Sequence, residues 1–321
     1  MTIDHLATKK IGILGLGVNN LQLVLFLAGQ GIRLAVRERK DAVKEDFEAR
    51  YPELARLVTW QIGERTLDGL QEFEVLFRSP VIPYLSPPLQ QAMKKGVVLY
   101  SQTKLFFDLC PCPIVGVSGT KGKGTTSTLI YRILTAGYRQ GKSYLAGNIG
   151  VDPFSFLEQL RPEDRVVLEL SSFQLQDLHK SPQFAVLLRV SSDHLDHHAS
   201  LQEYREAKKP LLAFQQPDDA AIINVEAPEM AEFAASAPGR HYLYAKYQPR
   251  RQSAWVDEST GREVVFVQID DQLTSFDIQD RRLIGAHNLE NILPAALVGA
   301  LHGIPADILQ REICAFPGLE R

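Results

Sequence analysis

The chain has 321 residues, 45% hydrophobic and 23% charged, a composition typical of a soluble globular protein that excludes a disordered or fibrous chain. Its 35 basic and 38 acidic side chains leave a net charge of −3, so we expect no nucleic acid and no membrane surface as a partner. No apolar run approaches the roughly 20 residues of a membrane span, and three cysteines are too few for a disulfide framework. We therefore expect a cytoplasmic, monomeric protein of about two domains.

Short β-branched runs alternate with helix-length amphipathic stretches along the chain. This alternation predicts an α/β fold with a mainly parallel sheet. We expect a Rossmann-like N-terminal domain over residues 1–108, in which Gly17 and Asn19 turn the chain before a helix over 21–30. The predicted strands of this domain cover residues 10–15, 32–36, 75–77 and 97–99.

Two prolines within residues 108–113 predict a linker, and a second α/β domain is expected over residues 109–315. Residues 241–284 contain alternating runs that favour a small antiparallel β region. The last residues, 316–321, resemble the start of a linker to a further domain. The predicted strands of the second domain cover 114–117, 166–170, 185–190 and 220–224, and its predicted helices cover 125–136, 286–302 and 306–315.

A glycine-rich segment, Gly116–Thr126, follows a predicted strand and opens a predicted helix, which is the context of a phosphate-binding loop. Its glycines would let successive N–H groups point at phosphate oxygens at a helix N-terminus. Lys123 would reach the β- and γ-phosphates, and the hydroxyl of Thr125 or Thr126 would complete a Mg²⁺ shell. Gly124 departs from the general Walker pattern, which has Ser or Thr there. The predicted nucleotide-binding residues are Gly119, Thr120, Lys121, Gly122, Lys123, Gly124, Thr125 and Thr126.

A weaker turn, Gly15–Asn20, carries the first two glycines of a dinucleotide fingerprint, and Glu38 lies at a fitting distance on the next strand end. Three interpretations stay open for this turn. It could bind a dinucleotide in an oxidoreductase, contact another diphosphate, or serve packing alone.

Four further clusters follow the phosphate-binding loop in the sequence. They are Gly147–Gly150, Glu169–Leu175, Asp193–His198 with Tyr204–Lys208, and His287–Asn291. Together they resemble the Mur ligase superfamily of ATP-dependent amide-forming enzymes. The run Glu-Leu-Ser-Ser-Phe-Gln-Leu over 169–175 is similar to that of the members that add D-glutamate in peptidoglycan precursor synthesis.

The resemblance implies a reaction in which ATP phosphorylates the carboxylate of UDP-N-acetylmuramoyl-L-alanine and the amine of D-glutamate then attacks the acyl phosphate. A carboxylate that approaches the γ-phosphate meets like charge, and one pair of unit charges repels by about 4 kcal/mol at about 4 Å and an effective dielectric constant near 20. Mg²⁺ between them would remove this repulsion, and the resemblance implies two Mg²⁺ sites.

The resemblance also assigns catalytic roles to Lys123, Glu169, His194 and Lys208. Glu169 would ligate the Mg²⁺ that the loop hydroxyl binds, although it could instead cap the next helix. His194 would bind a second Mg²⁺ and lie near the substrate. Lys208 would be carbamylated, which requires a lowered lysine pKa; a solvated helix lysine, or Lys209 in its place, is the alternative. The implied metal ligands are Thr125, Glu169, His194 and Lys208.

The remaining implied contacts are with adenine and with the UDP-linked substrate. Asn288 and Asn291 share a helix face that would meet adenine, although Asn288 could also cap its helix. Asn148 would contact the substrate near its reacting end. In the N-terminal domain Val81 replaces the family's usual glycine. The implied substrate-binding residues are Leu16, Gly17, Val18, Asn19, Glu38, Arg39, Ser79, Pro80, Asn148 and His194.

Two departures from the pattern leave alternatives open. The run Lys123-Gly124-Thr125 is also similar to folylpolyglutamate synthase, and the chain could be a non-catalytic module that binds a nucleotide or a UDP-sugar. Residues 316–321 resemble the entry to a third domain, which in the family binds D-glutamate. We therefore expect this chain to be inactive as a ligase without that domain.

Overall fold

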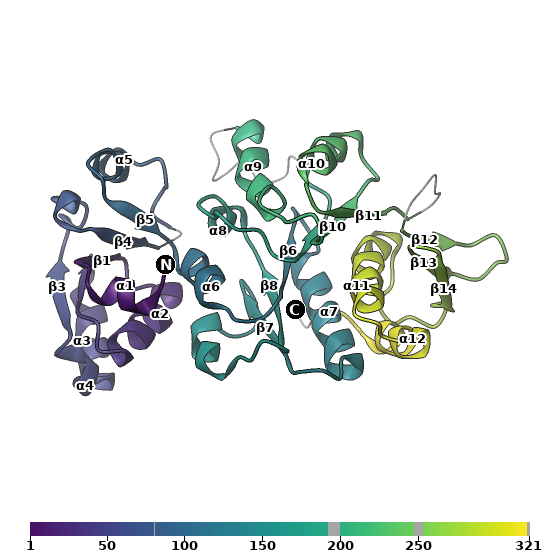
Figure 1. Cartoon of the computed structure of the whole chain (residues 1–321), viewed down its shortest axis with the longest axis horizontal. Helices are drawn as coiled ribbons and strands as arrows, with labels where there is room; N and C mark the ends of the chain where they lie inside the picture. Colours follow the sequence, from purple (N-terminus) through teal and green to yellow (C-terminus); the bar gives the residue numbers. More distant parts are fainter. Residues whose placement is uncertain (80, 192–199, 247–252, 320–321) are drawn as a thin grey trace. The chain divides into compact units, whose positions relative to one another are not determined.

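The computed structural model describes residues 1–79, 81–191, 200–246 and 253–319 (Figure 1). The chain forms two compact units, each described here by itself. The N-terminal unit contains Met1–Cys110 and Asp152–Gln159, and the central unit contains Pro111–Val151 and Leu160–Arg321. The sequence prediction placed the boundary after residue 108 and assigned 152–159 to the second domain, so the return of this segment to the N-terminal unit is a difference from the prediction.

The N-terminal unit is built on a five-stranded parallel sheet with the strand order β3-β2-β1-β4-β5. The order reverses between β1 and β4, and a crevice forms at the carboxyl ends of strands at such a point. The strands are β1 (Ile11–Leu14), β2 (Leu34–Glu38), β3 (Val58–Ile62), β4 (Val75–Arg78) and β5 (Val98–Tyr100). The helices are α1 (Ile3–Ala7), α2 (Val18–Gly29), α3 (Asp41–Arg50), α4 (Pro52–Ala55), α5 (Pro87–Lys94) and α6 (Gln102–Leu109).

The returning segment supplies aromatic side chains to the core of the N-terminal unit. The ring centroid of Phe154 lies 5.2 Å from that of Phe26 on α2 and 6.1 Å from that of Phe106 on α6. Asp152 caps the short helix that begins this segment and accepts a hydrogen bond of 2.6 Å from the Gln102 amide. Edge-to-face ring contacts of this kind add to the free energy gained by burying the rings.

The central unit contains a nine-stranded sheet with the order β14-β13-β12-β11-β10-β9-β6-β8-β7. Pairing is parallel from β7 to β12, and only β12, β13 and β14 pair antiparallel among the described strands. The predicted α/β fold is therefore confirmed, but the antiparallel part is smaller than residues 241–284. The strands are β6 (Ile114–Ser118), β7 (Ser143–Gly147), β8 (Arg165–Glu169), β9 (Phe184–Leu187), β10 (Ala220–Asn224), β11 (Arg240–Tyr244), β12 (Ala254–Asp257), β13 (Val264–Ile269) and β14 (Gln272–Asp277).

Helices α7 and α11 contribute the largest apolar surface to the core of the central unit, and α12 packs beside them. The predicted helix over 286–302 is divided, because a short 3-10 turn, Ala286–Asn288, precedes α11. None of the helices in the described part of the chain has the length and apolarity that a bilayer crossing requires. The helices are α7 (Lys123–Gly137), α8 (Ser172–Leu175), α9 (Leu201–Lys208), α10 (Ala231–Ser236), α11 (Leu289–Leu301) and α12 (Ala306–Ala315).

Candidate active site

The glycine-rich loop joins the carboxyl end of β6 to the N-terminus of α7 in the central unit. Gly119 has φ +152°, and a Cβ atom there would lie 2.6 Å from the Cβ of Leu188. Gly122 has φ +83°, and a Cβ atom there would lie 2.1 Å from the Oδ1 of Asn291. The loop therefore needs glycine at both positions, for backbone conformation and for space.

Two lysine side chains converge on this loop. The Nζ of Lys123 donates to the carbonyl oxygens of Gly119 (3.3 Å) and Thr120 (3.1 Å). The Nζ of Lys208, a residue with 1% exposure, donates to the Ser118 hydroxyl (3.3 Å) and to the Gly119 carbonyl (3.1 Å). Within the described residues, both ammonium groups thus have neutral oxygen acceptors and neither forms an ion pair.

The charge of these lysines is weakened by their surroundings. Burial, with a smaller contribution from the nearby Lys123 ammonium, lowers the pKa of Lys208 to about 7. Burial also lowers the pKa of Lys123, while the carboxylate of Glu169 opposes this change. Near pH 7 a substantial fraction of Lys208 is therefore the neutral amine. The alternative of a solvated Lys208 does not fit its burial, and Lys209 instead forms ion pairs with Glu206 and Glu232.

Glu169 ends β8 and is buried, and burial raises the pKa of its carboxyl group. The ammonium of Lys123 and a hydrogen bond from the Asn148 side chain oppose that rise. A Cβ atom on Gly124 would lie 3.2 Å from the Oε2 of Glu169. Glycine at the position after Lys123 therefore gives the carboxylate room beside the loop. The helix that follows β8 is capped by Ser171, so capping does not explain Glu169.

The structure separates the roles of the two loop threonines. The hydroxyl of Thr126 donates to the Oδ1 of Asn291 (3.2 Å), and the Asn291 amide donates to the Oδ1 of Asn288 (2.9 Å). The Asn288 amide donates in turn to the carbonyl of Ile284, and its side chain makes no capping hydrogen bond to α11. Thr125, which lines the adjoining cavity, is thus the threonine whose hydroxyl this network does not engage.

A cavity of about 610 Å³ lies between the loop and the N-terminus of α11. It combines loop residues with residues that follow β9 and residues of the His287–Asn291 cluster. Sequence analysis did not select Leu188, Arg189, Ser191 or Glu290. The first two lie inside the predicted strand over 185–190, but in the structure β9 ends at Leu187 and they follow it toward the β6 loop. The lining residues are Thr120, Lys121, Gly122, Thr125, Leu188, Arg189, Ser191, His287, Asn288, Glu290 and Asn291.

The N-terminal unit has a second cavity of about 740 Å³ at the point where its strand order reverses. Glu38 lies in its wall, but the carboxylate accepts the backbone N–H groups of Leu16 (2.8 Å) and Arg39 (2.7 Å). Glu38 therefore holds the backbone of the glycine turn and of the residue that follows β2. The lining residues are Leu14, Gly15, Gly17, Arg37, Glu38, Arg39, Thr66, Leu67, Ser79, Val81, Ile82 and Pro83.

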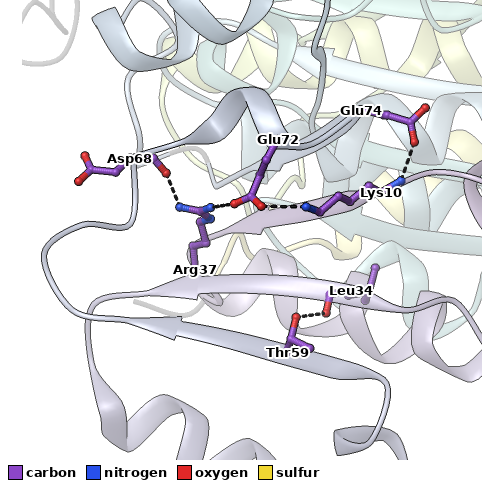
Figure 2. A network of polar contacts seen from close by, with 7 residues as sticks. All are labelled: Lys10, Leu34, Arg37, Thr59, Asp68, Glu72 and Glu74. Atoms are coloured by element: carbon purple, nitrogen blue, oxygen red, sulfur yellow. Dashed lines mark hydrogen bonds and ion pairs between the residues drawn. The ribbon is translucent and has the colours of Figure 1, made fainter.

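Arg37 belongs to the strand end Arg37–Arg39 that the resemblance assigns to the UDP pocket, and it is a buried cation in the wall of this second cavity. Figure 2 shows its guanidinium between the carbonyl of Asp68 and the carboxylate of Glu72. Lys10 binds the other oxygen of Glu72 at 2.8 Å, and mainly this hydrogen bond lowers the pKa of the Glu72 carboxyl group. The charge of Arg37 is thus paired within the N-terminal unit.

Several predicted residues cannot be placed at either cavity. Pro80 and His194 lie outside the described residues, as do the side chains of Val18 and Asn19. Leu16 is buried at the glycine turn but does not line the cavity. Lys123, Glu169, Lys208 and Asn148 are brought together around the loop of the central unit by the contacts described above.

Comparisons with known proteins agree with this arrangement. Residues 117–299 match the family described as the Mur ligase middle domain, and residues 9–101 match the family described as the Mur ligase MurD-like N-terminal domain. The chain belongs to the Mur ligase family. This confirms the resemblance inferred from the sequence.

The Mur ligase family members most similar in sequence include two named UDP-N-acetylmuramoylalanine--D-glutamate ligase. The protein from Symbiobacterium thermophilum is 36% identical over 97% of this chain and 68% of its own length. The protein from Acetivibrio thermocellus is 34% identical over 97% of this chain and 66% of its own length. The chain thus spans about two thirds of the length of the curated relatives it matches.

Solved structures of Mur ligases share the fold. The ligase MPL from Neisseria meningitides matches with a TM-score of 0.63 at 18% identity, over 98% of this chain and 100% of that chain. The MurF ligase from Thermotoga maritima, solved in complex with ADP, matches with a TM-score of 0.52 at 17% identity, over 88% of this chain and 63% of that chain. At this level of identity the likeness supports the fold alone.

Proposed function

We propose that the protein is an ATP-dependent ligase that adds D-glutamate to UDP-N-acetylmuramoyl-L-alanine in the synthesis of peptidoglycan precursors. The observation that carries the proposal is the glycine-rich loop at the N-terminus of α7, on which the half-buried Lys123 and the buried Lys208 converge beside the carboxylate of Glu169. N–H groups at a helix N-terminus and a lysine ammonium bind phosphate oxygens, so such a site favours a ligand that carries phosphate groups. The names of the most similar relatives supply the substrates.

In the proposed reaction a carboxylate oxygen of the muramoyl substrate bonds to the γ-phosphorus of ATP, and ADP leaves. The amine of D-glutamate then attacks the acyl carbon, loses a proton and displaces phosphate as the amide forms. Lys123 and the loop N–H groups would hold the phosphates. Asn148, whose side chain hydrogen-bonds to Glu169, would orient the reacting end of the substrate.

The residues around the loop fit a divalent cation in part. Glu169 supplies a buried carboxylate and Thr125 a hydroxyl, and both are hard oxygen donors of the kind that Mg²⁺ prefers. In the described part of the chain, no group of three or more His, Cys, Asp and Glu residues could hold a metal ion. Bound Mg²⁺ would supply charge neutralisation between the reacting anions. The second Mg²⁺ site stays a prediction, because it depends on His194.

We propose that Lys208 supplies the missing anionic ligand as a carbamate. Its neutral amine would attack CO₂, and loss of one proton would leave a carboxylate on Nζ. The pKa of about 7 supports this step, because it makes the neutral amine accessible near pH 7. A ¹³C-bicarbonate NMR experiment should show one carbamate signal that grows as the pH rises through 7 and is absent in Lys208→Ala. The same signal in Lys208→Ala would assign the carbamate elsewhere.

We propose that the protein is monomeric and cytoplasmic. We also propose that the cavity of the N-terminal unit binds the UDP moiety of the substrate. Thermal melting tests the ligand assignment, because a ligand that binds only the folded state raises the melting temperature. UDP-N-acetylmuramoyl-L-alanine and Mg-ATP should each raise it. A rise with a folate and none with the UDP ligand would favour the folylpolyglutamate synthase-like alternative.

Ligase turnover is a separate measurement. Formation of ADP, phosphate and the D-glutamyl product would establish the enzyme activity, and binding of both ligands with no turnover would favour the non-catalytic module. The expectation that this chain is inactive alone stays a prediction, and the same assay on residues 1–321 tests it. NADH binding in the N-terminal cavity would revive the oxidoreductase interpretation.

A further inference from the structure

The cavity of the central unit contains a negative charge that the proposed phosphate chemistry does not use. Among the described residues that line this cavity, Glu290 alone carries a carboxylate. It lies in the first turn of α11, between Asn288 and Asn291. A carboxylate in the wall of a cavity that binds a polyanion would repel the phosphates, so its presence calls for another role.

Contacts on two sides fix the Glu290 carboxylate in place. The Nζ of Lys246 lies 2.9 Å from Oε1, and the amide of Asn224 donates to Oε2 at 3.2 Å. Asn224 is fully buried at the carboxyl end of β10, and its Oδ1 accepts the backbone N–H of Glu226. Lys246 follows β11 closely in the chain. The carboxylate is thus held by residues at two neighbouring strand ends.

Glu290 and Asn291 reach in different directions from the same helix turn. Asn291 contacts Thr126 of the loop, whereas Glu290 contacts Asn224 and Lys246 at the ends of β10 and β11. The side chain of Glu290 is 17% exposed. Glu290 thus lines the cavity on the side of the strand ends, and its carboxylate makes no contact with the loop residues in the described part of the chain.

The carboxylate still has capacity to accept hydrogen bonds from a ligand. An ionised carboxylate has about four acceptor positions, and the contacts of Glu290 with Lys246 and Asn224 account for two. A nucleotide offers vicinal hydroxyl donors on its ribose, next to the phosphates along the ligand. Acidic side chains bind ribose hydroxyls in this way in dinucleotide-binding folds.

We propose that Glu290 binds the ribose hydroxyls of the nucleotide and makes the central cavity selective for ribonucleotides over deoxyribonucleotides. The inference rests on the proposed binding of ATP in this cavity. Lys246 and Asn224 act as positioning residues, because they hold the carboxylate rather than the sugar.

The experiment compares the affinities of ATP and 2′,3′-dideoxy-ATP, each with Mg²⁺, by equilibrium titration. The wild-type chain should bind ATP at least tenfold more tightly, because hydrogen bonds from hydroxyls to a charged acceptor are among the stronger ones. In Glu290→Ala the affinity for ATP should fall to within about twofold of that for the dideoxy nucleotide. The affinity for the dideoxy nucleotide should stay nearly unchanged, which also shows that the variant is folded.

Glu226→Ala is the matched control. Glu226 lies beside the same strand ends and accepts the backbone N–H of Lys246, but it does not line the cavity. Its ATP preference should equal that of the wild type. An equal loss of affinity for both nucleotides in Glu290→Ala, or an undiminished preference for ATP, would overturn the inference. ATP binding without any sugar preference in the wild type would overturn it and leave the proposed function standing, whereas absence of ATP binding would overturn both.

Discussion

Each of the two units has a glycine turn after the first strand of its sheet, and the two turns differ in how their charges are satisfied. In the N-terminal unit the carboxylate of Glu38 binds the N–H of Leu16, and the buried Arg37 pairs with Glu72. In the central unit Lys123 and Lys208 have only neutral acceptors within the described residues. The glycine spacing alone does not distinguish a packing turn from a phosphate site, whereas the convergence of two lysine side chains on the central loop favours the phosphate site.

The largest expected effect is the loss of ATP affinity on replacement of Lys123 in the central loop. Lys123→Ala removes a partly buried cation from the proposed phosphate site, and we expect the affinity for Mg-ATP to fall about 100-fold or more, as measured by equilibrium titration. Asn20→Ala, which removes the amide that binds the Gly15 carbonyl in the other turn, should leave ATP affinity unchanged. Equal losses in the two variants would contradict the assignment of phosphate binding to the central unit.

Alanine substitutions at the glycines of the two turns should lower the free energy of unfolding by different amounts. Gly122→Ala combines a positive φ with a Cβ position 2.1 Å from the Oδ1 of Asn291, and we expect a loss of about 3 kcal/mol in the free energy of unfolding. At Gly15 the nearest atom is the Cβ of Ser79 at 3.3 Å, so Gly15→Ala should cost about 1 to 2 kcal/mol. Urea denaturation measures both. Gly31→Ala, with a positive φ and open space around it, gives the cost of the backbone conformation alone.

Acid should destabilise the central unit through His302. Burial lowers the pKa of its ring from 6.5 to about 4, and the ring accepts a hydrogen bond from Arg165. Between pH 6.5 and pH 4 the His302 ring therefore binds a proton in the unfolded chain but not in the folded chain. Its contribution to the free energy of unfolding is fully present above pH 6.5 and is lost as the pH falls toward 4. At 1.36 kcal/mol per pKa unit the loss is about 3 kcal/mol. His302→Leu should flatten this part of a denaturation profile, and an unchanged slope would assign it to another group.

The smallest effect should come from the ion pair in the N-terminal unit. Glu72→Gln removes the charge that Arg37 and Lys10 share in Figure 2, and we expect a loss of about 1 kcal/mol, because the Glu72 side chain is 45% exposed. Asp46→Asn, at the exposed pair of Asp46 with Arg50, should change stability much less. If chemical denaturation showed the same loss in the free energy of unfolding for both variants, the ion pair of Arg37 with Glu72 would contribute no more than an exposed pair.

Much of the fold could be predicted from the sequence because its buried parallel strands are short apolar runs. The predicted strands at 114–117 and 220–224 agree with β6 and β10 to within one residue. Strand β3, Val58–Ile62, was missed although its residues alternate between apolar and polar, because it is not a continuous apolar run like the other strands of its sheet. The helix over 21–30 begins three residues earlier, at Val18, where Gly17 is the N-cap residue.

The site could be predicted only where a motif carries the chemistry locally. The loop, Glu169 and Lys208 were found from sequence clusters. The choice between Thr125 and Thr126 required Asn291, which lies 165 residues further along the chain. The roles of Glu290 and Arg37 depend on partners such as Asn224 and Glu72 from other elements, and a single sequence does not show such tertiary contacts.

The return of Asp152–Gln159 to the N-terminal unit has a consequence for how this protein can be divided. The chain passes between the units at three places rather than one, so a single cut after Cys110 would leave Phe26 and Phe106 without their aromatic neighbour Phe154. Exchange of the N-terminal unit with that of another ligase would have to carry this eight-residue insert with it. Joining the two units end to end at one point would therefore remove Phe154 from the hydrophobic core of the N-terminal unit.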